Sequence, residues 1–134
     1  MAVLVKVNEA AVTALGQCLV TVRPYKGADP QGGEDAYLWV SQTAGGEGLS
    51  MHGRIREVLG HGGGVDLRID ITDQAPRRPL TKEMLQPYRD GGAIPVMVGL
   101  AGKLYRHAHT KVAELDEAET AFLASHFLSD EGEA

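Results

Sequence analysis

The stretch AYLWVSQTAGGEGLSMHGRIREVLGHGGGVDLRIDI, residues 36–71, determines the expected fold class. It holds three apolar runs, 36–41, 53–59 and 65–72, which are separated by glycine-rich breaks. The last run alternates apolar and polar residues, a pattern typical of a strand with one solvent-facing side. The breaks are too short to contain crossover helices, so we expect neighbouring strands to pair antiparallel.

Two more strands are expected before this stretch. Val3, Val5 and Val7 alternate with Leu4 and Lys6, and the run 18–23 is rich in β-branched residues. The chain thus contains five expected strands within its first 72 residues.

The remainder of the chain favours helices. A short helix is expected near Thr81, interrupted by Pro87, and a second over residues 96–106. Asp116 followed by Glu119 forms an acidic version of a capping box and starts a third helix. The tail 129–134 is expected to be frayed. The sequence therefore predicts one α+β, mostly β domain over residues 1–134, a five-stranded antiparallel barrel or half-barrel with peripheral helices.

Composition narrows the classes of protein to consider. The net charge of -5 disfavours non-specific binding to long nucleic acid, although a local basic groove is compatible with it. Cys18 is the only cysteine, so neither an internal disulfide nor a cysteine-based zinc site is possible. No apolar run has the length of a membrane span or the form of a signal peptide. We therefore expect a cytoplasmic protein that needs no cofactor and does not bind membranes.

The two glycine clusters have different interpretations. HGGG, residues 61–64, lies between two strands, and no nucleophile elbow accompanies it, so a hairpin turn is favoured over an oxyanion hole. GGEG, residues 45–48, leads into a strand and not into the helix that a phosphate-binding loop requires. Its glycines, Gly46 among them, still allow a ligand to approach the backbone closely.

Histidines offer two chemical alternatives. His107 and His109 would share one face of a strand, but no further ligand completes a metal site, so we expect no metal. Ser50 with His52 or His61 as general base would make a small hydrolase. That alternative requires serine and histidine to lie within hydrogen-bonding reach in one cleft.

An aromatic strand face is the main candidate for ligand binding. Trp39 lies on the same face as Tyr37 and Ser41, opposite Leu38 and Val40. These three side chains would form the wall of a pocket that stacks a flat ring, with Ser41 making polar contacts. The other interpretation is that Trp39 is simply a core residue.

A second aromatic lies among cationic residues. Tyr25 falls between Arg23 and Lys26, a combination typical of sites that stack a base beside its phosphate. With Arg54, the two cations are the candidate phosphate-binding residues.

The order of these features resembles the EVE-like members of the PUA-like superfamily. The resemblance rests on an R-P-x-K-G loop, the acidic turn 33–35, the run AYLWVS, the segment Gly53-Arg54-Ile55 and the segment 110–127 that leads into a closing helix. It implies a five-stranded pseudobarrel whose cleft takes a modified base in DNA or RNA and performs no covalent chemistry. Trp39 and Ser41 are the positions that correspond to the cleft.

The sequence therefore predicts a non-enzymatic recognition module for a planar heterocycle, most simply a modified nucleobase in DNA or RNA. The small hydrolase stays open as an alternative. So does a structural protein that assembles through an exposed strand or the last helix, and the sequence is compatible with a monomer or a homodimer.

Overall fold

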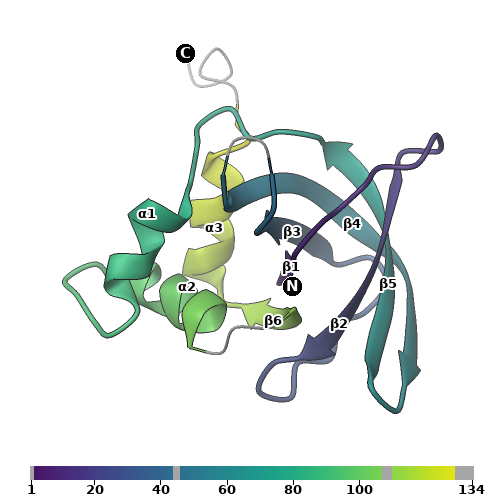
Figure 1. Ribbon diagram of the computed structural model, residues 1–134, viewed down its shortest axis with the longest axis horizontal. Coiled ribbons are helices and arrows are strands. Elements are labelled where there is room, and N and C mark those ends of the chain that lie inside the picture. The colour runs from purple at the N-terminus through teal and green to yellow at the C-terminus, as the bar shows by residue number, and fades with distance from the viewer. Residues whose placement is uncertain (1, 44–45, 107–109, 129–134) are drawn as a thin grey trace.

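The computed structural model describes residues 2–43, 46–106 and 110–128 (Figure 1). The expected frayed tail at 129–134 and the histidine pair at 107 and 109 lie outside these ranges. The elements follow one another as β1 (Ala2–Val7), β2 (Gln17–Pro24), β3 (Asp35–Val40), β4 (Gly48–His61), β5 (Gly64–Asp73), α1 (Lys82–Leu85), the 3-10 helix η1 (Gln86–Tyr88), α2 (Pro95–Tyr105), β6 (Lys111–Leu115) and α3 (Glu117–Ser125).

The strands form one sheet that closes on itself in the order β1-β3-β4-β5-β2-β6. Four neighbouring pairs are antiparallel, and the pairs β1–β3 and β2–β6 are parallel. The parallel pair β1–β3 is possible because the chain passes through β2 between the two strands, which gives it the long crossover that parallel pairing requires. The ring closes through a short contact, because β2 and β6 pair only at Arg23–Lys111 and Pro24–Val112.

The mostly β class is confirmed, but the sheet has six strands and not the five that the sequence indicated, and it is mixed and not purely antiparallel. The missed strand, β6, pairs with β1 and β2, which come from the other end of the chain. Four of its five residues are buried, and only Glu114 is exposed. A strand buried on both faces shows no alternation of apolar and polar residues, and this explains why the sequence did not reveal it.

The hairpin expected at HGGG is confirmed. His61 and Gly64 pair across the turn between β4 and β5. Gly64 has φ +157°, and a Cβ atom at this position would lie 2.5 Å from the carbonyl oxygen of Val22. Glycine is therefore required here by the close approach of β2, in addition to the turn.

Two hydrophobic cores lie on the two sides of the sheet. The first fills the interior of the ring and includes Val5, Leu38 and Ile69. The second lies between the outer surface of the sheet and the helices, which Figure 1 shows gathered on one side of the ring. β3 contributes to both cores, because Leu38 and Val40 point inward whereas Tyr37 and Trp39 point toward the helices. The alternation expected for this strand is confirmed.

The last helix begins as expected. The Asp116 side chain accepts a hydrogen bond from the Glu119 amide, and the Glu119 side chain accepts one from the Asp116 amide. Glu119 is 3 % exposed and also forms an ion pair with Lys103 on α2. A Cβ at Gly99 would lie 2.4 Å from Glu119 Oε2, so this helical glycine allows the two helices to meet.

The apolar residues of α3 and of the segment just after it differ in their exposure. Leu123 is 1 % exposed, and Phe122 and Phe127 pack against the second core, whereas Leu128 is 54 % exposed. None of the helices in the described part of the chain combines the length and apolar character needed to cross a bilayer.

Candidate functional site

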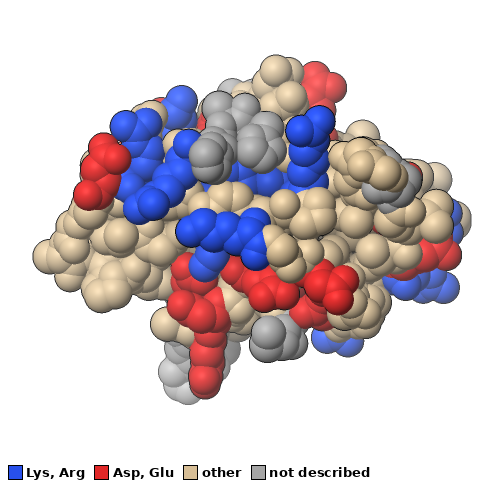
Figure 2. Space-filling view, turned by 90° about the horizontal axis from the view of Figure 1, so that it is seen from below, with Lys and Arg blue, Asp and Glu red and all other residues tan. Residues whose placement is uncertain are grey.

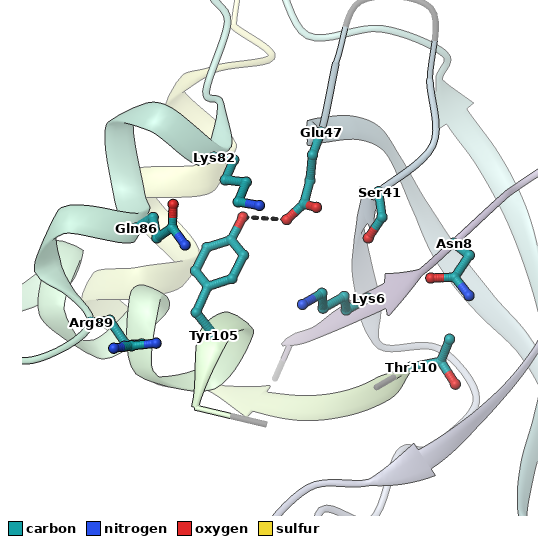
Figure 3. A pocket seen from close by; sticks show the side chains of 9 residues that line it. All are labelled: Lys6, Asn8, Ser41, Glu47, Lys82, Gln86, Arg89, Tyr105 and Thr110. Carbon is teal, nitrogen blue, oxygen red and sulfur yellow. Dashed lines mark hydrogen bonds between the residues drawn. The ribbon is translucent and has the colours of Figure 1, made fainter. Parts of the chain in front are cut away.

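A cleft of about 330 Å³ lies where the ends of β1 and β3 meet the helices (Figure 3). We call it the Glu47 cleft. Its lining comes from segments far apart in the sequence: Lys6, Asn8, Ser41, Glu47, Lys82, Gln86, Arg89, Tyr105 and Thr110. Every one of these side chains carries a polar group, so the cleft suits a polar ligand.

Glu47 is held in place by two donors. Its Oε2 atom accepts hydrogen bonds from Trp39 Nε1 at 3.1 Å and from the Tyr105 hydroxyl at 2.5 Å. Among the described residues, nothing donates to the other oxygen, Oε1. The two donors therefore fix the carboxylate in orientation.

The surroundings of Glu47 keep it ionised. Burial is the largest single effect and would raise the pKa of this carboxyl group. The hydrogen bonds from Tyr105 and Trp39, together with the charges of Lys6 and Lys82, outweigh burial, so the pKa of Glu47 is lowered. Glu47 therefore presents a negative charge in the cleft at neutral pH.

Tyr105 acts as a permanent donor. Burial raises the pKa of its phenol, and the hydrogen bond to Glu47 and the negative charge of Glu47 raise the pKa further. The hydroxyl consequently keeps its proton and continues to donate it to the carboxylate.

Lys6 is 8 % exposed and is fixed by two contacts. Its Nζ atom donates to the Leu104 carbonyl oxygen at 2.7 Å and lies 4.7 Å from the centroid of the Tyr105 ring. Burial lowers the pKa of Lys6; Glu47 acts in the opposite direction, and Lys82 lowers the pKa further.

Cationic groups outnumber the carboxylate in the cleft. Lys6, Lys82 and Arg89 lie with the single acid Glu47 in its lining, although the whole chain carries a net charge of -5. On the face drawn in Figure 2, many Lys and Arg side chains gather in one region, and a group of Asp and Glu side chains lies next to it. The cleft is therefore suited to an anionic ligand.

The predicted aromatic wall is wrong. Trp39 and Tyr37 are 0 % and 3 % exposed, and both belong to the core between the sheet and the helices. The β3 face that carries them is covered by helices, because an apolar ring on that face gains more from packing than from exposure. Trp39 instead influences the cleft through its indole N–H, which orients Glu47.

Of the other predicted ligand-binding residues, Ser41 lies in the cleft and Gly46 lies beside it. Ser41 follows β3 and lines the cleft directly. Gly46, with φ +94°, ends the turn that begins at Thr43 and immediately precedes Glu47. Gly46 thus helps the chain deliver the Glu47 side chain, although it does not itself line the cleft.

The predicted phosphate-binding residues do not line the cleft. Arg54 pairs with Asp35 at 3.7 Å, and Arg23 lies beside the β4–β5 hairpin. Lys26 Nζ lies 5.5 Å from the centroid of the Tyr25 ring. The cations of the Glu47 cleft come instead from β1 and from the segment that contains α1 and η1.

Tyr25 lies next to a buried lysine that the sequence did not single out. Lys111 is 1 % exposed, and its Nζ atom lies 4.8 Å from the Tyr25 ring centroid without a hydrogen-bond acceptor among the described residues. Lys111 is directly opposite Lys6 across the β1–β6 pair. Burial, followed by the charge of Lys6, lowers the pKa of Lys111 to about 8.

Ser50 and His52, two residues of the hydrolase alternative, form hydrogen bonds with different partners. Ser50 Oγ donates to the Gly48 carbonyl oxygen, while His52 Nδ1 contacts Asp73 Oδ2 at 3.0 Å and Thr72 Oγ1 at 3.1 Å. The side chain of His61 lies outside the described part of the structure. Within the described ranges, no group of three or more His, Cys, Asp or Glu side chains is arranged to hold a metal ion.

Most of the cleft was not foreseen from the sequence. Glu47, Lys82, Arg89 and Tyr105 belong to segments that only the fold brings together. Lys6 could have been singled out from the sequence, because it is the only charged residue in an otherwise apolar strand. When such a strand is buried on both faces, the lysine needs a polar partner.

Replacing Tyr105 with phenylalanine is expected to lower the free energy of unfolding at neutral pH by about 1–2 kcal/mol, because a hydrogen bond to a charged group is lost. The pKa of Glu47 lies below its unfolded value, so its stabilisation is present above that value and is lost as the pH falls. Without the Tyr105 donor that pKa rises, and the variant should lose less stability than the wild type on acidification from neutral pH. Urea unfolding at neutral pH and at an acidic pH, below the unfolded pKa of a glutamate, measures both effects.

The matched control is Tyr88→Phe. Tyr88 also packs against the second core, but its hydroxyl makes no hydrogen bond with the described residues. An equal loss of stability in both variants, unchanged by pH, would contradict the role assigned to the Tyr105 hydroxyl.

In comparisons with known proteins, no family model, curated protein or solved structure gives a significant match to the chain.

Proposed function

We propose that the Glu47 cleft is a recognition site for a nucleotide, with the base edge at Glu47 and the phosphate at Lys82 and Arg89. The observation that carries the proposal is the ionised carboxylate whose orientation is fixed by Trp39 and Tyr105 in a cleft lined by further polar and cationic side chains. The nucleotide is either free or part of a DNA or RNA strand.

The carboxylate selects a base that presents donors. A glutamate accepts hydrogen bonds from the exocyclic amino group of cytosine, whereas the O4 atom of uracil or thymine offers only an acceptor at the same place. An acceptor facing Glu47 leaves two unpaired acceptors in a partly desolvated site. Among the pyrimidines, cytosine, with or without a further modification, is therefore the expected base.

Two cations of the cleft lining, Lys82 beside Glu47 and Arg89 farther along the helical side, serve the phosphate. Lys82 is on α1 and Arg89 follows η1, so both come from the helical side, and Figure 3 shows them with Tyr105 in the cleft lining. Guanidinium and ammonium groups are the usual partners of phosphate in proteins. A cleft of about 330 Å³ lies in the range of small-ligand sites.

The acidic net charge fits this proposal better than binding along a duplex. Affinity for a long phosphate backbone needs many cations on one surface, whereas one nucleotide needs only a few. The PUA-like, EVE-like resemblance stays a prediction, and the proposal rests on the cleft and not on that resemblance.

Binding of CMP and UMP, measured by calorimetry, tests the proposal. We expect the wild type to bind CMP about 10-fold more tightly than UMP, because the wrong base leaves polar groups unpaired. In Glu47→Gln this preference should largely disappear, since a glutamine amide can donate to O4 as well as accept from N4.

The control is Glu57→Gln, which removes one carboxylate from an exposed position on β4. It should keep the wild-type preference for CMP. Equal binding of CMP and UMP by the wild type, or no binding of either, would overturn the proposal.

A further inference from the structure

Lys6 has the surroundings of a reactive amine. Its side chain lines the Glu47 cleft although it is only 8 % exposed, so a ligand in the cleft reaches the amine while bulk water is largely kept away. A buried amine close to another cation is more often neutral than a surface lysine, and the neutral form is the nucleophile. The lowered pKa of Lys6, caused by burial and by Lys82 against the opposing effect of Glu47, agrees with this geometry.

In the neutral form of Lys6, its contacts leave the lone pair usable. A neutral amine has two N–H donors and one lone pair. One donor is engaged by the Leu104 carbonyl oxygen at 2.7 Å, which fixes the position of the nitrogen. Groups that can take up or release a proton are in the same lining, because Glu47 and Lys82 both face the cleft (Figure 3).

We propose that Lys6 captures a phosphorylated aldehyde in the Glu47 cleft by forming an imine. The inference rests on the proposed function for one element, the phosphate site at Lys82 and Arg89, and goes beyond it in assigning a covalent step. The chemical class of the ligand is an aldehyde that carries a phosphate a few bonds from its carbonyl group, as in an open-chain sugar phosphate.

The reaction is balanced without an oxidant or a reductant. The lone pair of Lys6 Nζ attacks the carbonyl carbon, a C–N bond forms, and the carbonyl π electrons move to the oxygen, which takes up a proton as the nitrogen loses one. The hydroxyl group of this carbinolamine is then protonated and leaves as water, and the C=N bond forms. Hydrolysis reverses the sequence, so the imine is a reversible covalent complex.

Pyridoxal 5′-phosphate is the probe for the test. The wild-type protein is incubated with it near neutral pH, reduced with borohydride and mapped by peptide mass spectrometry. We expect Lys6 to be labelled about 10-fold faster than the exposed Lys26, because a desolvated amine is the stronger nucleophile at that pH. Unphosphorylated pyridoxal should label Lys6 much more slowly, while ribose 5-phosphate should compete with the probe more strongly than ribose.

Two variants that retain Lys6 test the inference without disturbing this buried lysine. Lys82→Ala retains the Lys6 amine but removes a phosphate partner, so labelling of Lys6 by the phosphorylated probe should fall several-fold. Arg68→Ala removes an exposed cation on β5, outside the cleft, and should leave the labelling unchanged.

The outcomes separate this inference from the proposed function. Labelling distributed over the lysines according to their exposure, or labelling of Lys6 that does not depend on the phosphate, would overturn imine capture. Preferential CMP binding together with an unlabelled Lys6 would leave nucleotide recognition standing and remove the covalent step. Phosphate-dependent labelling of Lys6 in a protein that does not distinguish CMP from UMP would support imine capture alone.

Discussion

Replacing Trp39 with alanine is expected to lower the free energy of unfolding by about 3–5 kcal/mol, the usual cost of removing a large aromatic side chain from a core. The indole is 0 % exposed and packs with Leu85, Leu100 and Leu104 in the core between the sheet and the helices. It also meets the Tyr105 ring edge-on, with 6.3 Å between the ring centroids. Urea unfolding followed by circular dichroism measures the change without the tryptophan signal.

Trp39→Phe separates packing from hydrogen bonding. Phenylalanine retains much of the apolar volume but cannot donate to Glu47, so this variant should lose less stability than Trp39→Ala and should still bind nucleotide less well than the wild type. If Trp39→Ala abolished ligand binding while stability stayed unchanged, the indole would be a binding surface and the assignment of Trp39 to the core would be wrong.

Replacing Lys111 with methionine is expected to stabilise the protein at neutral pH by up to about 3 kcal/mol, because an ammonium group without an acceptor is replaced by an apolar side chain of similar length. The figure follows from a folded pKa of about 8 against an unfolded value near 10.4. The cation–π contact with Tyr25 offsets part of the gain.

The effect of this substitution should depend on pH, with a sign that follows from linkage. Below pH 8 the ammonium is charged in both states, and the cost of burying it is fully present. Between about pH 8 and 10.4 the folded state has lost the proton while the unfolded chain retains it, so the stability of the wild type rises with pH. The advantage of Lys111→Met should therefore shrink across this range, which urea unfolding at neutral pH and near pH 10 measures.

The control is Lys26→Met, at an exposed lysine that lies over the same Tyr25 ring. This change should alter stability by only a few tenths of a kcal/mol at either pH, as for most surface substitutions. A clear loss of stability in Lys111→Met at neutral pH would show that the Lys111 ammonium has a stabilising partner, contrary to the role assigned to it.

Local patterns predicted the elements that depend on neighbouring residues. The alternation over 65–72 became β5, and the glycine run 61–64 became a hairpin turn. The Asp116–Glu119 capping box starts α3 as expected. Each of these features depends on residues a few positions apart, so its physical cause is contained in a short window of sequence.

The candidate site was not predictable in the same way. The sequence indicated that Tyr37 and Trp39 share a strand face, and the structure agrees, but alternation cannot tell whether that face meets solvent or a helix. The helices cover this face. The polar residues that line the Glu47 cleft lie at the margin where the helices meet the sheet. Ser41 is the one predicted ligand-binding side chain that lines the cleft, because it lies just beyond the covered part of β3.

The sequence by itself determined that this chain is mostly β, where its turns fall, and how the faces of β3 divide, because propensity, glycine conformation and side-chain alternation act over a few residues. The tertiary structure alone decided that a sixth strand closes the ring and that Lys6, Glu47, Lys82 and Tyr105 meet in one cleft. These residues are separated by up to about a hundred positions, and their approach is set by the burial of both faces of the sheet, a property of the whole fold and not of any segment.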